Sequence, residues 1–156
     1  MRWARPGSRE RGEALIEFAL SFFLIFTAFS GIFRFAYSFY CYNALVAAVR
    51  EGARYASLKP YDSITTTPSA SFLTAVQNMV VYADANPQGG TKPVVPGIQP
   101  GNVALTVTGG GTGTLTVPTQ MTVAISGFTI DAVFGIWNLN GKPNCTFSYT
   151  GILTPP

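Results

Sequence analysis

The sequence lacks histidine altogether and contains only two cysteines among its 156 residues. Without histidine, the chain has neither the commonest metal ligand of proteins nor their usual general base at neutral pH. Two cysteines by themselves are too few for a zinc ion, which needs four ligands. The acidic residues outside the apolar amino-terminal segment form no recognisable catalytic motif; they are Glu51, Asp62, Asp84 and Asp131. We therefore expect no enzymatic activity, no metal site and no cofactor.

Charged residues are also scarce, and they are unevenly placed. Together they make up 11% of the chain, and the formal net charge is +3. Residues 1–12 hold a single acid, Glu10, and four arginines, which are Arg2, Arg5, Arg9 and Arg11. Without residues 1–12, six basic and six acidic side chains remain, so the rest of the chain is neutral. The basic charge therefore belongs to a leader, and no nucleic-acid partner is expected.

A long apolar run follows this leader. Residues 14–33 contain one charged side chain, that of Glu17. Twenty helical residues rise about 30 Å, which is the thickness of the hydrocarbon core of a bilayer. We predict a membrane-spanning helix over about residues 14–35, with the arginines on the cytoplasmic side and the carboxyl-terminal part outside. The alternative is a signal peptide cleaved after Ala28-Phe29-Ser30, but a charge within its apolar core argues against it.

Glu17 also lies at a defined distance from a glycine in the string Gly12-Glu13-Ala14-Leu15-Ile16-Glu17-Phe18. This string resembles the class III leader site of type IV prepilins. The resemblance implies cleavage by a prepilin peptidase between Gly12 and Glu13, and a role for Glu17 and Phe18 in assembly and subunit register. The new ammonium at Glu13 could then pair with Glu17 of a neighbouring subunit, and such a pair is strong when desolvated. The alternative is that the Glu17 carboxylate extends to the lipid headgroups. The carboxylate of Glu13 lies one helical turn away and would repel that of Glu17.

The helix is predicted to continue far beyond the membrane, because Pro60 is the first residue that must stop it. A helix over residues 13–58 would be roughly 68 Å long. Six of the ten residues 33–42 are aromatic, which is typical of the outer headgroup level. Glu51 and Arg54 are three positions apart and are expected to pair on the helix surface.

The end of this helix carries a second family resemblance. Its string, Ala48-Val49-Arg50-Glu51-Gly52-Ala53-Arg54-Tyr55-Ala56, is similar to the segment that follows the membrane helix in TadE-like proteins, with Arg50, Glu51, Gly52 and Arg54 as the most specific positions. Together with residues 12–20, the resemblance covers about a third of the chain.

The resemblance to TadE-like proteins implies a minor pilin, or pseudopilin, of a tight-adherence (Flp/Tad) type IVb/IVc pilus that takes part in pilus assembly and adhesion. Major pilins of these systems are much shorter than this chain. The implied partners are a prepilin peptidase, other pilins or pseudopilins, and the inner-membrane assembly platform. The implied location is the bacterial inner membrane, with possible incorporation into a surface pilus. The alternative is a single-pass anchored envelope protein whose distal part binds a partner without polymerising.

The remaining residues, 59–156, are predicted to form an extracytoplasmic domain that makes the fold α+β. Thr67 and Pro68 are expected to cap and begin a short amphipathic helix that ends near Asp84. Strand signals over residues 103–108, 114–126 and 145–153 predict a small antiparallel sheet of three to four strands, and Pro118 suggests a bulge or an edge. In the middle strand, the residues expected to share one face are Leu115, Val117, Met121, Val123 and Ile125.

Residues 128–142, between the last two predicted strands, are unusually apolar for a connection. They could pack over the sheet, contact a partner or touch the membrane.

The two cysteines lie far apart in the sequence, Cys41 at the outer end of the membrane helix and Cys145 in the last predicted strand. An extracytoplasmic compartment permits a disulfide. A bridge between them would close a loop of about 100 residues and stabilise the fold by about 4–5 kcal/mol in the chain-entropy description. Proximity of Cys41 to lipid could instead keep the two thiols apart.

Overall fold

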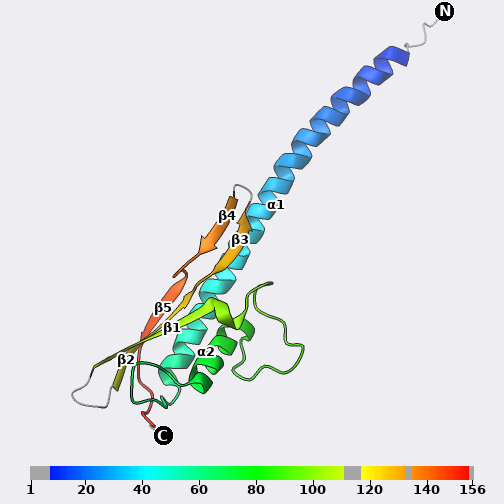
Figure 1. The fold of residues 1–156 in the computed structure, drawn as a ribbon. Coiled ribbons are helices and arrows are strands. Elements are labelled where there is room, and N and C mark those ends of the chain that lie inside the picture. The colour runs from blue at the N-terminus through cyan, green and yellow to red at the C-terminus, as the bar shows by residue number, and fades with distance from the viewer. Residues whose placement is uncertain (1–7, 111–116, 133–134, 155–156) are drawn as a thin grey trace, which may run out of the picture. The chain divides into compact units, whose positions relative to one another are not determined.

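The computed structural model describes residues 8–110, 117–132 and 135–154, and side chains from residue 12 onward. The described elements are α1 (Ser8–Leu58), α2 (Ala70–Tyr82), the 3₁₀ turn η1 (Pro100–Asn102), β1 (Val103–Gly110), β2 (Val117–Ile125), β3 (Phe128–Ala132), β4 (Gly135–Leu139) and β5 (Asn144–Ser148). They confirm the α+β fold, with a long amino-terminal helix, a short second helix and small antiparallel sheets (Figure 1). The chain divides into two compact units, one up to Tyr37 and one from Ser38, which we call the distal unit.

The unit up to Tyr37 consists of the first part of α1. From Glu13 to Tyr37 its side chains are exposed, apart from Gly31, which is half-buried. Of the helices in the described residues, α1 is the one long and apolar enough to cross a membrane. Its apolar side chains surround the helix on all sides, as a helix surrounded by lipid requires.

From Ser38 onward, α1 has one buried face and one exposed face. The buried residues recur every three or four positions, which places them on one stripe of the helix; they are Ser38, Cys41, Leu45, Ala48, Val49, Gly52, Ala53, Ala56 and Ser57. Most of these side chains are small, so neighbouring elements can approach the helix axis closely. The exposed stripe carries Asn43, Arg50, Glu51 and Arg54. The helix ends at Leu58, shortly before Pro60.

The second helix lies beside the carboxyl-terminal turns of α1 (Figure 1). It buries one apolar face, formed by Phe72, Ala75, Val76, Val80 and Val81. The expected cap was wrong, because the N-cap is Ser69 rather than Thr67. The helix ends at Tyr82, and Ala83 follows with a left-handed φ of 55°.

The main sheet has three antiparallel strands in the order β1-β2-β5. Val103 pairs with Ile125 at one end of the β1–β2 ladder, and Val123 pairs with Cys145 between β2 and β5. Buried side chains alternate along the strands, and those of Met121, Val123 and Ile125 lie fully in the core.

The middle strand contains the expected irregularity at its proline. Thr108 pairs with Gln120 and Gly109 pairs with Pro118, so Thr119 is an extra residue in β2. Such a bulge reverses the alternation of side chains across the sheet. Pro118 is therefore buried and Val117 is 44% exposed, which corrects the prediction that Val117 shares the core face. Leu115 lies outside the described residues.

The apolar segment 128–142 is a hairpin rather than a plain connection. Among the described residues, β3 and β4 pair only with each other, with Ile130 opposite Trp137 and Asp131 opposite Ile136. Ile130, Ala132 and Leu139 are buried, so one face of the hairpin packs into the distal unit.

Candidate functional site

The predicted leader-site residues all lie in the part of α1 that precedes Ser38. Gly12 and Glu13 are both helical, and no atom comes within 4 Å of a Cβ built on Gly12. The side chains of Glu13 and Glu17 are exposed and are one helical turn apart. Within the described part of the chain, no cation forms an ion pair with Glu17. An unpaired carboxylate in an apolar segment is energetically costly, so pairing with a cation would be favourable. The exposed carboxylate of Glu17 is accessible to such a cation from another molecule.

Phe18 begins a ladder of aromatic rings along α1. Its ring stacks on that of Phe22 with centroids 6.2 Å apart, and Phe22 stacks on Phe26 with centroids 5.9 Å apart. The four-residue spacing brings these rings onto one face of the helix. The ladder was not noticed in the sequence, although this repeat of phenylalanine is its signal. It gives the helix a flat, polarisable stripe next to Glu17.

The four residues of the helix-end string do not form one site. Gly52 points inward, and a Cβ added there would overlap Cγ2 of Val80 on α2. Glycine has no side chain, so at this position Val80 can lie directly against the backbone of α1. Arg50, Glu51 and Arg54 are exposed on the opposite side of α1.

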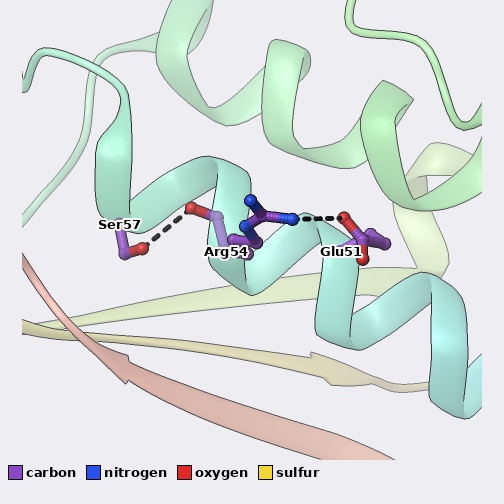
Figure 2. A network of polar contacts seen from close by, with 3 residues as sticks. All are labelled: Glu51, Arg54 and Ser57. Atoms are coloured by element: carbon purple, nitrogen blue, oxygen red, sulfur yellow. Dashed lines mark hydrogen bonds and ion pairs between the residues drawn. The ribbon is translucent and has the colours of Figure 1, made fainter.

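Figure 2 shows the polar contacts on the helix surface. The guanidinium Nη1 of Arg54 lies 3.9 Å from Oε2 of Glu51, as the spacing predicts, and the Ser57 hydroxyl donates to the Arg54 carbonyl at 2.8 Å. The two charged side chains are 64% and 58% exposed. An exposed pair of this kind contributes only about 0.3–0.5 kcal/mol. The pair therefore matters little for stability, and both charges stay accessible to another molecule.

Both cysteines border the same core. Cys41 is 3% exposed within it, and Cys145 is half-buried against it. They are free thiols in this structure. The disulfide between them stays a prediction.

A hydrogen-bonded cluster that the sequence analysis did not find fixes the start of α2. The Ser69 hydroxyl donates to Oδ2 of Asp62 at 2.6 Å and accepts from the backbone N–H of Phe72 at 3.1 Å. Ser71 donates to the same carboxylate oxygen at 3.1 Å. Burial raises the pKa of Asp62, but the hydrogen bonds from both serines and from its own backbone N–H, together with the charge of Lys59, hold that pKa below its ordinary value of 3.8. The cluster orients the capping hydroxyl; its role is structural.

A second polar cluster joins the carboxyl-terminal segment to the end of α1. The Tyr149 hydroxyl accepts from the Tyr61 N–H at 2.9 Å and lies 2.9 Å from the carbonyl of Ile152 and 3.1 Å from that of Lys59. Burial raises the pKa of Tyr149, and the hydrogen bond from Tyr61 only partly offsets this. The hydroxyl is therefore a neutral donor and acceptor at physiological pH.

No group of three or more metal-ligating side chains occurs in the residues that the structure describes.

Comparison with known proteins gives one family. The TadE-like protein family matches residues 12–54. The matched segment includes the whole string from Gly12 to Phe18, and the string at the end of the helix as far as Arg54. No curated protein and no solved structure matches the chain. Over residues 12–54, this chain is therefore similar to TadE-like proteins.

Proposed function

We propose that this chain is a minor pilin of a tight-adherence pilus. The TadE-like match over residues 12–54 is the observation that carries the proposal, because this segment includes the leader site and the helix. The TadE-like family is structural rather than enzymatic, and α1 suits a membrane anchor in such a protein. The proposed partners are a prepilin peptidase, other pilins or pseudopilins, and the assembly platform of the inner membrane.

In this proposal, peptidase cleavage after Gly12 frees the amino group of Glu13. Glu17 then pairs with such an ammonium on a neighbouring subunit. Glu17 is exposed and has no ion-pair partner among the described residues, which supports this proposal because the carboxylate needs a cation in an apolar surrounding. The pair would set the axial register between subunits, and the phenylalanine ladder that begins at Phe18 would pack beside it. The distal unit would stay outside the cytoplasm and join the pilus in adhesion.

The first test is the intact mass and amino-terminal sequence of the full chain, made with and without a cognate prepilin peptidase. A new terminus at Glu13 that appears only with the peptidase is the expected result. An uncleaved chain beside an active peptidase would refute the pilin assignment and leave an anchored envelope protein. A terminus at Gly31 would identify a signal peptide instead.

The second test is the recovery of the cleaved protein in sheared pilus fractions. Glu17→Gln keeps the shape of the side chain and removes its charge, so we expect normal processing but loss of the protein from the pili. Asp84→Asn is the matched control, because it removes an exposed carboxylate outside the apolar run and keeps the oxygen that accepts from the Asn86 N–H. Equal recovery of the Glu17→Gln variant and the control would rule out the pairing role of Glu17.

A further inference from the structure

We propose that the β3–β4 hairpin rests on the outer surface of the membrane that α1 crosses. In this proposal, the exposed apolar side chains of the hairpin contact the lipid headgroup region. This inference depends on the membrane orientation given under the proposed function, and adds a second membrane contact to the single helix.

The hairpin is attached to α1 at the first residues of the distal unit. The hydroxyl of Ser38, which is fully buried, donates to the carbonyl of Asp131 at 3.0 Å. The ring of Trp137 meets that of Phe39 edge to face, with centroids 6.0 Å apart. Asp131 is the next-to-last residue of β3, so the turn end of the hairpin is the end that lies at Ser38.

This attachment lies at the level where α1 is expected to leave the membrane. The predicted membrane span, about residues 14–35, ends three residues before Ser38, which is about 4.5 Å along the helix. Ser38 and Phe39 therefore lie at the outer boundary of the hydrocarbon core. Trp137, which contacts Phe39, is brought to the same level.

The exposed side chains at this level suit a headgroup region. Ile136 is 65% exposed and Trp137 is 37% exposed, and both belong to the short strand β4. Phe39 and Tyr40 on α1 are also exposed. Tryptophan and tyrosine concentrate at membrane interfaces, where an apolar ring and a polar N–H or O–H are both accommodated. A hairpin that faced only water would leave this apolar group uncovered.

The test uses the fluorescence of Trp137 in the full chain. Trp3→Phe makes Trp137 the sole tryptophan, since the chain has two. The variant is reconstituted into vesicles of phosphatidylcholine and phosphatidylglycerol, with bromine carried either shallow or deep on the acyl chains. Flotation of the vesicles separately reports whether α1 has inserted.

A matched control moves the tryptophan to the other end of the distal unit. In the triple variant Trp3→Phe, Trp137→Phe, Ile152→Trp, the reporter replaces an apolar side chain that is 71% exposed. Ile152 lies beyond the end of α1, because its carbonyl accepts a hydrogen bond from the Tyr61 N–H. Leu58, the last residue of α1, is twenty helical positions after Ser38, a rise of about 30 Å.

We expect shallow bromine to quench Trp137 more strongly than deep bromine, and iodide to quench it weakly. The tryptophan at position 152 should show the reverse, with quenching by iodide and none by either lipid. Floating vesicles in which iodide quenches Trp137 and bromine does not would overturn the hairpin contact but leave the anchor intact. Protection of Trp137 from both quenchers would overturn it in favour of a protein partner or a second copy. Failure to float would overturn the anchor and the hairpin contact together.

Discussion

Gly52→Ala is the substitution that best tests how α1 is held in the distal unit. A Cβ at this position would overlap Cγ2 of Val80 and would lie 3.5 Å from its Cβ and 3.8 Å from its Cα. Val80 is fully buried, and a valine in a helix keeps essentially one rotamer, so its methyl group has nowhere to turn. The helices must therefore separate to admit the methyl group.

Two opposing effects set the magnitude of this change. Overpacking a closed core costs about 1–3 kcal/mol. Replacing glycine by alanine within a helix returns about 0.5–1 kcal/mol, because alanine loses less conformational freedom on folding. We expect a net loss of about 1–2 kcal/mol in the free energy of unfolding, since the overlap is with a stiff, buried side chain. For a unit of this size, the melting temperature should fall by about 4–8 °C.

The assay is thermal unfolding of the full chain in detergent micelles, followed by near-ultraviolet circular dichroism. Ala47→Gly, at an exposed position of α1, measures the effect of helix propensity without packing and should cost about 0.5–1 kcal/mol. In a Val80→Ala background, Gly52→Ala should become stabilising, because the obstructing methyl groups are gone. Stabilisation by Gly52→Ala with Val80 in place would refute the close approach of α1 and α2.

Three further predictions concern the distal unit. Tyr149→Phe should lower the free energy of unfolding by about 0.5–1.5 kcal/mol, because it removes a half-buried hydroxyl that makes several hydrogen bonds; an unchanged melting temperature would contradict this. Since the pKa of Asp62 is lowered by folding, its stabilising effect should be full above pH 3.8 and lost as the pH falls through the folded pKa. The difference in melting temperature between the wild type and Asp62→Asn should therefore shrink on acidification, and a constant difference would count against the serine cluster. Mild oxidation should lower the intact mass by two hydrogen atoms through a bridge between Cys41 and Cys145, and Cys41→Ala should abolish the change; a mass unaffected by oxidation would remove the bridge from consideration.

The long helix could be predicted because its signals are local. The apolar run, the first obstructing proline and the Glu51–Arg54 spacing each depend on neighbours within a few residues. The alternation of the β1 and β2 strands was visible for the same reason. Pro118 even indicated where the alternation would fail, although only the observed register showed that Val117 turns outward.

The hairpin and the helix cap could not be predicted in this way. The alternation of apolar and polar residues in β3 lasts only five residues, and β4 shows none, so the segment was interpreted as a hydrophobic connection. Thr67 and Ser69 are both good caps, and a proline after Thr67 favoured the wrong one. The deciding partner was Asp62, seven residues before Ser69, whose contact appears only once the loop between α1 and α2 has folded.

The role of Gly52 also could not be predicted, because nothing near it in the sequence indicates that Val80 will lie against it. A glycine inside a helix costs stability, so the position is justified only by the packing partner that it admits. Assembly and the stability of the distal unit therefore depend on different parts of the same helix. The proposed assembly residues, 12–18, lie in the unit up to Tyr37, whereas Gly52 acts inside the distal unit. Gly52→Ala should therefore lower the melting temperature and leave processing after Gly12 unchanged, whereas Glu17→Gln should block assembly without altering the melting temperature. A variant that changed both properties together would mean that the fold of the distal unit and the assembly function depend on each other.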